Sequence, residues 1–262
     1  MSCSFAQVLI SQQLFNMTVK TVDGTALASV KTIVGIAISS AKTINGISLT
    51  GGGGGGGLSI LQTKAVDMSG TGSTSKTFTP DASLTAGSCL LLLFRTETGF
   101  TAVSDGTNTW NHDVNSTGGG QQLHAWSAPN NAATGTPTFT LTAGAGYTLF
   151  GGVFIEIGGA NTSTPVETSA TATNSYGTDR YAGALTISGD AYVFGWYLDS
   201  NTGLDDATYG LTPDAGYTRV AYITSSVNLG IIYQLLTAGT YNPHGLTSTG
   251  YGGNLGAAIA IK

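Results

Sequence analysis

Charged residues are scarce in this chain of 262 residues, at 9% against about 25% in an average soluble protein. Cysteine is scarcer still. With only Cys3 and Cys89, neither a disulfide framework nor a cysteine metal site can form. No uninterrupted apolar run approaches the ~20 residues of a membrane helix. These shortages exclude disulfide-rich scaffolds, zinc-finger proteins and insertion into a membrane by a helix.

The few charges are divided unevenly along the chain. Up to residue 76, five lysines against two aspartates leave +3, while beyond it four cations against twelve acids leave −8, which together give −5. We expect the basic N-terminal part and the acidic body to contact different binding surfaces. The alternative is that the uneven charge is evolutionary drift in a charge-poor chain and has no function. An acidic body argues against nucleic-acid binding, which needs a basic face.

Residues for acid–base chemistry are also few, which predicts a protein that is not an enzyme and uses no cofactor. A glycosidase pair of Glu156, expected near a sheet edge, with Asp113 is a minor alternative. His112 and His124 are expected to face each other across a hairpin, on solvent-facing strands. No third ligand is suggested, so no metal site is predicted. The glutamates and histidines of the chain are Glu97, Glu156, Glu167, His112, His124 and His244.

The segment 17–50 repeats one eleven-residue pattern, as VKTVDGTALAS, VKTIVGIAISS and AKTINGISLT. Asp23-Gly24 and Asn45-Gly46 are strong signals for two-residue hairpin turns, and the flanking β-branched residues favour strands. We therefore predict three short β-hairpins. A helical eleven-residue repeat is the competitor, which the glycine in every copy disfavours. The positions shared by the copies are Lys20, Lys31 and Lys42, and Gly24, Gly35 and Gly46.

Hairpins of this size cannot bury their own apolar side. The repeated arm is therefore predicted to dock on another surface or on other copies of itself, in a homo-oligomer for which a trimer is favoured. Packing of the arm against the body of its own chain is the alternative.

Seven glycines, Gly51–Gly57, follow the arm. They lack the G-K-[S/T] ending of a phosphate-binding loop, so we expect a linker that spans on the order of 15 Å. Close-packed polyproline-II-like chains in a trimer are the alternative. The expected division is an extension at 1–16, the arm at 17–50, the linker at 51–57 and a body at 58–262. The extension makes a poor signal peptide, and whether translation starts at Met1 or at Met17 stays open.

The body shows a β pattern throughout. Strand-like runs such as CLLLLF, which places Cys89 in the interior, alternate with turn residues such as Asp105-Gly106, and no segment keeps a helical period with caps. Roughly twelve strands in 200 residues predict an all-β fold, as a two-sheet jelly-roll β-sandwich.

A resemblance supports this fold. The stretches AGSCLLLLFRTETGFTAVSDGTNTWNHD and QQLHAWSAPNNAATGTPTFTLTAGAGYTLFGGVFIEIGGANTSTPVETSATAT, within about residues 65–175, resemble a lectin-like jelly-roll module of phage virion proteins and bacterial surface proteins. The repeated K-T-[I/V]-x-G arm is similar to N-terminal segments of phage fibre, neck and decoration proteins. The resemblance implies a virion or cell-surface setting and no particular chemistry.

The resulting prediction is a structural protein on the surface of a phage virion: a capsid decoration, head fibre or tail fibre. Its arm docks on other virion proteins, and its body contacts host-surface glycans. A secreted or surface carbohydrate-binding module of bacteria is the alternative. Trp110 and Trp196 are expected in the core, and the acidic segment Asp199–Asp206 is expected to be solvated rather than to bind calcium. The candidate glycan contacts are Tyr176, Tyr209 and Tyr251, which lie in Gly/Ser/Asp-rich stretches.

Overall fold

Every described element of the chain is a β-strand. The computed structural model divides the chain into two units, 1–57 and 58–262. No helix occurs among the described residues, which confirms the all-β prediction, and none there could therefore cross a membrane. The described ranges are 57–67, 75–97, 100–118, 120–143, 149–174, 178–199, 210–223, 228–247 and 254–262, with six two-residue strands between 21 and 48.

In the first unit the six short strands form three antiparallel pairs, and each pair brackets the two residues at which a turn is predicted. The pairs are β1 (Thr21–Val22) with β2 (Thr25–Ala26), β3 (Thr32–Ile33) with β4 (Ile36–Ala37), and β5 (Thr43–Ile44) with β6 (Ile47–Ser48). The predicted arm positions Lys20, Gly24, Lys31, Gly35, Lys42 and Gly46 lie outside the described residues. Docking through the arm therefore stays a prediction.

The first half of the second unit forms a five-stranded sheet, here called inner sheet 1, and a three-stranded sheet, outer sheet 1. Inner sheet 1 has the order β11 (Asn111–Gly118), β12 (Gln121–Ala128), β9 (Cys89–Glu97), β14 (Leu149–Gly158) and β7 (Ser59–Asp67). Outer sheet 1 has the order β10 (Phe100–Ser104), β13 (Phe139–Ala143) and β8 (Ser75–Phe78).

The second half forms inner sheet 2, outer sheet 2 and one further strand pair. Inner sheet 2 has the order β15 (Val166–Asn174), β24 (Asn254–Ile261), β18 (Ala191–Asp199), β21 (Asn228–Leu236) and β20 (Thr218–Ile223). Outer sheet 2 has the order β16 (Asp179–Tyr181), β23 (His244–Leu246) and β19 (Thr212–Pro213), and β17 (Leu185–Ile187) pairs with β22 (Gly239–Tyr241).

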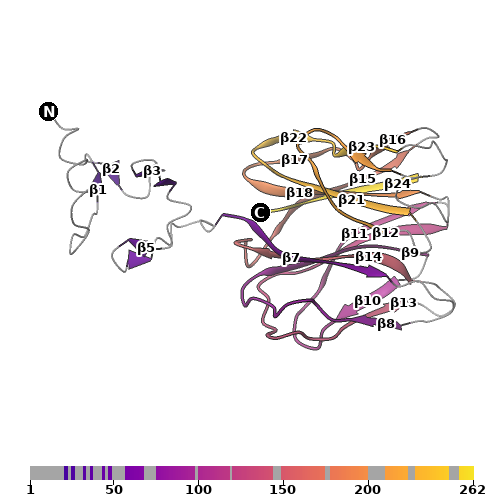
Figure 1. The fold of residues 1–262 in the computed structure, drawn as a ribbon, viewed down its shortest axis with the longest axis horizontal. Coiled ribbons are helices and arrows are strands. Elements are labelled where there is room, and N and C mark those ends of the chain that lie inside the picture. Colours follow the sequence, from indigo (N-terminus) through magenta and orange to yellow (C-terminus); the bar gives the residue numbers. More distant parts are fainter. Residues whose placement is uncertain are drawn as a thin grey trace. The chain divides into compact units, whose positions relative to one another are not determined.

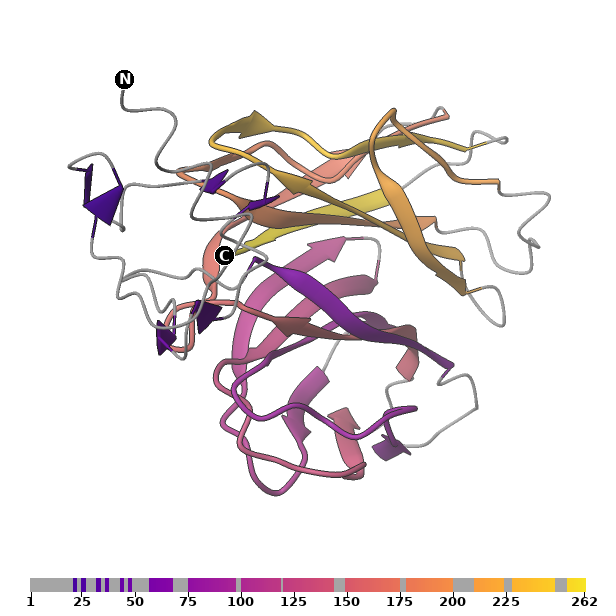
Figure 2. The ribbon, with the colours of Figure 1, turned by 60° about the vertical axis from the view of Figure 1, so that its left-hand side comes forward.

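These sheets stack in four layers, with the two inner sheets in the middle (Figures 1 and 2). Leu91 and Trp196 belong to a core shared by the inner sheets. The alternate residues face outward: Leu92 packs toward outer sheet 1, and Val193 packs toward the short strands of the second half. Both inner sheets are therefore covered on both faces, which explains the uninterrupted apolar run CLLLLF. Stacked antiparallel sheets are consistent with the predicted β-sandwich, but the expectation of two sheets is wrong, because each inner sheet is covered by further strands on its outer face.

The two halves have the same strand order. Taken in chain order, β11-β12-β9-β14-β7 corresponds to β20-β21-β18-β24-β15, and β10-β13-β8 corresponds to β19-β23-β16. Even one irregularity recurs, since the register shifts between His112 and Val114 on β11 and between Arg219 and Ala221 on β20. The ladders make Gly152 equivalent to Gly256, because they lie opposite the equivalent residues Phe94 and Tyr197.

Both equivalent glycines are required by close contacts. A Cβ at Gly152 would lie 2.1 Å from the Cβ of Phe94, and one at Gly256 would lie 1.9 Å from the carbonyl oxygen of Tyr181. Gly256 thus lets β16 of outer sheet 2 approach inner sheet 2, which positions the site described next.

Candidate functional site

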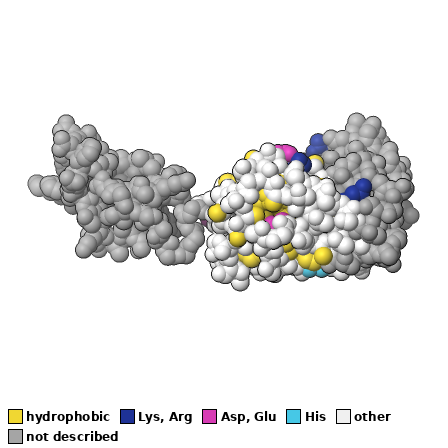
Figure 3. Space-filling view, turned by 90° about the horizontal axis from the view of Figure 1, so that it is seen from below, with side chains coloured by type: hydrophobic (Ala, Val, Ile, Leu, Met, Phe, Trp, Pro, Cys, Tyr) yellow, Lys and Arg dark blue, Asp and Glu magenta, His cyan; other side chains and the backbone are white. Residues whose placement is uncertain are grey.

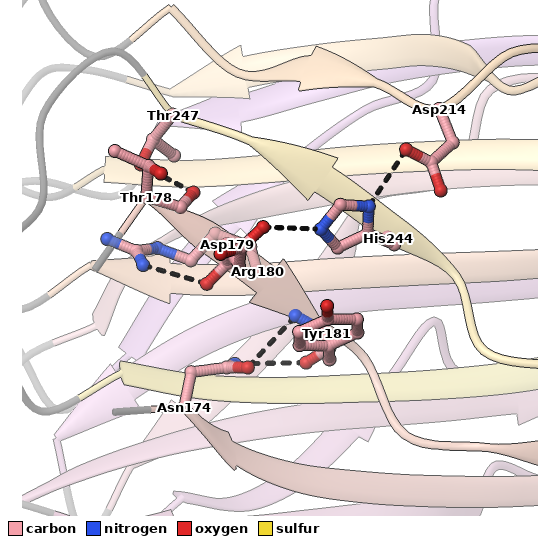
Figure 4. Close-up of polar contacts among 8 residues, drawn as sticks. All are labelled: Asn174, Thr178, Asp179, Arg180, Tyr181, Asp214, His244 and Thr247. Atoms are coloured by element: carbon pink, nitrogen blue, oxygen red, sulfur yellow. Dashed lines mark hydrogen bonds and ion pairs between the residues drawn. The ribbon is translucent and has the colours of Figure 1, made fainter. Parts of the chain in front are cut away.

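The outward face of outer sheet 2 carries exposed aromatic, apolar and acidic side chains close together. On β16, Asp179 and Tyr181 are exposed and Arg180 is buried; on β23, Leu246 is exposed and Gly245 is buried. This alternation follows from the pleat of the strands. In the ladder, Tyr181 pairs with the partly buried His244 and Asp179 pairs with Leu246, so these side chains share one face. Figure 4 shows Asp179, Tyr181 and His244 on this face.

His244 is held at the centre of this face by two carboxylates and one ring. Its Nδ1 lies 2.8 Å from Asp214 Oδ1 and its Nε2 lies 3.2 Å from Asp179 Oδ1. Its ring stacks on Tyr181, with centroids 4.5 Å apart and an angle of 29° between the planes. Because an ionised carboxylate only accepts hydrogen bonds, the ring satisfies both neighbours only as an imidazolium.

Tyr181 is exposed to 42%, yet its backbone is tightly held. The Tyr181 N–H donates to Asn174 Oδ1 and Asn174 Nδ2 donates to the Tyr181 carbonyl, both at 2.9 Å (Figure 4). The buried Arg180 donates from Nη1 to the Asp179 carbonyl at 3.0 Å. Thr247 closes the end of the strand, because its N–H donates to the Thr178 carbonyl at 2.9 Å. The ring is therefore presented from a fixed base.

The electrostatics of this face are negative. The side chains of Asp179 and Asp214 keep 58% and 51% of their surface exposed. The nearest cation along β16, Arg180, is completely buried, and no lysine occurs between Lys76 and Lys262. The arrangement can bind a partner by stacking on an aromatic face and by offering acceptors to its donors.

The three tyrosines predicted as glycan contacts, Tyr176, Tyr209 and Tyr251, lie outside the described residues. The described residues that adjoin their segments meet at one end of outer sheet 2, where Thr178 bonds with Thr247 and Thr212 lies opposite Leu246. The prediction about these tyrosines stays open.

A second polar cluster confirms that His112 and His124 face each other. His112 Nε2 lies 3.0 Å from His124 Nδ1, and His124 Nε2 lies 3.0 Å from Thr96 Oγ1. His112 also stacks on Trp126 at 4.4 Å. The expectation that both histidines face solvent is wrong for His124, which is fully buried. No group of three ligands that could hold a metal exists within the described ranges.

Burial sets the titration behaviour of this cluster. It lowers the pKa of His124 to about 3, with a further lowering by His112, so the ring is neutral at physiological pH. Burial raises the pKa of Asp113 to about 6, an effect that Ser127 partly opposes. Burial, and secondarily Asp113, raises the pKa of the Cys89 thiol to about 12, so the thiol stays protonated and unreactive. Its exposure of 1% confirms the predicted interior position.

Glu156 does not lie at a sheet edge, and this corrects the sequence-based expectation. It lies on β14, between β9 and β7, and is only 1% exposed. Its carboxylate accepts hydrogen bonds from Gln62 Nε2 at 2.6 Å, from the Thr85 N–H at 2.6 Å and from Ser88 Oγ at 2.9 Å. These bonds tie β7 and the segment before β9 to β14, which is a structural role.

The glycosidase pair of Glu156 with Asp113 is also wrong. Three strand spacings separate β14 from β11, or roughly 14 Å. The carboxylate pairs of glycosidases lie within about 10 Å of each other. The tryptophans behave nearly as expected: Trp196 is fully buried, and Trp110 is partly buried against the first outer core.

Searches with the chain find no matching family, no similar curated protein and no similar solved structure.

Proposed function

We propose that this protein is a structural interaction protein of a phage virion surface, such as a capsid decoration, head fibre or tail fibre. Its arm at 17–50 docks on the particle or on other copies, and its body at 58–262 is displayed toward host-surface glycans. The observation that carries the proposal is the exposed Tyr181 ring. Asn174 holds its backbone, His244 stacks on it, and Asp179 and Asp214 lie beside it.

The site is suited to recognition on a surface. It lies on an outward sheet face and uses side chains rather than loop backbone. Many buried polar groups elsewhere in the described body are committed to the fold, as Glu156 is through its three hydrogen bonds. A body that exposes the aromatic ring of Tyr181 on a sheet face fits a display protein better than a catalyst.

The strand order supports a jelly-roll assignment for each half. When the separate β17–β22 pair of the second half is set aside, consecutive strands alternate between the large and the small sheet, apart from β11 and β12 and their equivalents β20 and β21. The first and last strands of each half, β7 with β14 and β15 with β24, are neighbours. Alternation of this kind is typical of jelly rolls in capsid and lectin proteins.

The assembly part of the proposal is tested by light scattering on two chains, full length and 58–262. The shorter chain keeps all three buried cores of the second unit and is expected to be a monomer. The full-length chain is expected to be an oligomer. If both are monomeric, the oligomerising arm is wrong.

The location is tested on particles. Antibodies against the body should label the surface of intact phage in the source culture. Recovery of the protein only from culture medium without particles would instead favour the second candidate, a secreted bacterial carbohydrate-binding module, which the same Tyr181 site would serve.

A further inference from the structure

The Tyr181 ring is prepared for stacking before any ligand arrives. His244 supports one side of it at 4.5 Å and Asn174 brackets its backbone, while 42% of the residue stays exposed. Leu246, exposed to 45%, adds apolar surface on the same face. A ring that is already fixed loses little conformational entropy on binding. The flat apolar side of a pyranose ring matches such a surface.

The charges of the face select among pyranoses. Asp179 and Asp214 each use Oδ1 toward His244 and remain about half exposed. On the ligand-facing side, the two carboxylates carry two negative charges against at most one positive charge on His244, whereas the cation Arg180 is buried on the opposite side of β16. A uronate or another acidic sugar would be repelled, whereas an ammonium group would be attracted both by the carboxylates and by the face of the tyrosine ring.

The equivalent face in the first half carries no such site. Among the described side chains, those on the outward face of outer sheet 1 are Ser75, Thr77, Ala102, Ser104, Thr140 and Thr142. Seen from this side, the described surface is mostly uncharged (Figure 3). Since the two halves share their strand order, the aromatic and acidic residues on outer sheet 2 are not demanded by the fold.

We propose that the outward face of outer sheet 2 binds a pyranose sugar that carries a protonated amino group. The sugar ring stacks on Tyr181, and its ammonium and hydroxyl groups donate to Asp179 and Asp214. This inference rests on the proposed function, because it names the class of glycan that the displayed body contacts.

The test is isothermal titration calorimetry of the full-length chain with a β-1,4-linked glucosamine trisaccharide and with its N-acetylated counterpart, which has the same rings without the charge. We expect the charged trisaccharide to bind about tenfold more tightly. Tyr181→Ala should weaken its binding at least about tenfold, while Tyr181→Phe, which keeps the ring, should stay within about twofold.

Asp214→Asn should weaken binding of the charged trisaccharide about fivefold and leave the N-acetylated one unchanged. The matched control is Asp190→Asn, which removes an exposed carboxylate outside outer sheet 2 and should change neither. Urea unfolding of each variant verifies that it is folded.

The inference is overturned if neither trisaccharide binds, if the N-acetylated one binds equally well, or if Asp190→Asn weakens binding as much as Asp214→Asn. A trilysine peptide that binds as tightly as the amino sugar would also overturn it, because the charge alone would then suffice. Labelled particles without amino-sugar binding would leave the proposed function standing. Binding without labelled particles would remove the virion assignment and keep the site.

Discussion

The two halves of the second unit use the same pair of strands in opposite ways. In the first half, Phe78 ends β8 and stacks on Phe139 at the start of β13, with centroids 4.8 Å apart; both rings are buried in the first outer core. In the second half, Tyr181 ends β16 and stacks on His244 at the start of β23, and Tyr181 faces outward. The aromatic pair of the first half is thus buried in a core, whereas the pair of the second half lies on the outer face of its sheet.

This difference separates what the fold requires from what it allows. Strand order, the register shift in β11 and β20, and the glycines in β14 and β24 recur in both halves. The polar residues do not recur. Glu156 is equivalent to Ala260, and Asp113 is equivalent to Val220, by the same ladders. The three predictions below test this division.

The largest effect is expected at the shared glycines. Gly152→Ala and Gly256→Ala should each lower the free energy of unfolding by about 3 kcal/mol or more. The added Cβ would lie 2.1 Å from the Phe94 Cβ in the first case and 1.9 Å from the Tyr181 carbonyl oxygen in the second. Urea unfolding of the full-length chain measures this. Gly189→Ala, which has no atom within 4 Å of its Cβ, is the control and should change stability by less than about 0.5 kcal/mol. Tolerance of either core substitution would break the equivalence of the halves.

An intermediate effect is expected at Glu156, the polar residue that only the first half contains. Glu156→Gln should lower the free energy of unfolding by about 2 kcal/mol, because hydrogen bonds to a buried charged group are weakened or lost. The control is Asp81→Asn, which removes an exposed ion pair with Lys64 and should cost less than about 1 kcal/mol. If both substitutions lower the free energy of unfolding equally, the buried carboxylate of Glu156 does not contribute more to stability than an exposed one, and the prediction is wrong.

The smallest effect is expected at Asp113 and depends on pH. Its folded pKa of about 6 lies above the ordinary aspartate pKa of 3.8, so the folded state binds more protons between these values. The ionised group therefore destabilises the fold fully above pH 6, and this penalty disappears below pH 4. Asp113→Asn should raise stability by about 1 kcal/mol at pH 7.5, after discounting for a partly exposed group, and by nothing at pH 4. A gain that is the same at both pH values would refute this.

Acidification changes the stability contribution of His124 in the opposite direction to that of Asp113, and the same pH series of unfolding measurements tests both. Its folded pKa of about 3 lies below the ordinary histidine pKa of 6.5, so the unfolded state binds more protons between these values. Stability therefore falls as the pH drops through this window. In the wild type the two residues partly cancel between pH 4 and 6. Asp113→Asn should therefore make the loss of stability on acidification steeper.

Features with a long pattern were predictable from the sequence. The run CLLLLF lies on a strand and is buried with Cys89, as expected. The strands that build the candidate site were not predicted. β16, β19 and β23 have two or three residues each, which is too short for an alternation to be recognised.

The site itself depends on contacts between distant segments. Asp179 and His244 are 65 positions apart. Their contact follows from the pairing of β16 with β23, and the sequence pattern does not indicate which distant strands pair. The equivalence of the halves was hidden for a related reason. GVFIEI in β14 and GAAIAI in β24 share their glycine and two isoleucines. The other three side chains of β14 are replaced by alanine in β24, which conceals the likeness.

The shared core has a further consequence for valency. It joins equivalent faces of the two inner sheets, as a symmetric dimer interface would, but within a single chain. A true dimer would carry every surface feature twice, whereas this chain carries the Tyr181 face once. Each polypeptide is thus monovalent at that face, and multivalent attachment would require several chains to be held side by side.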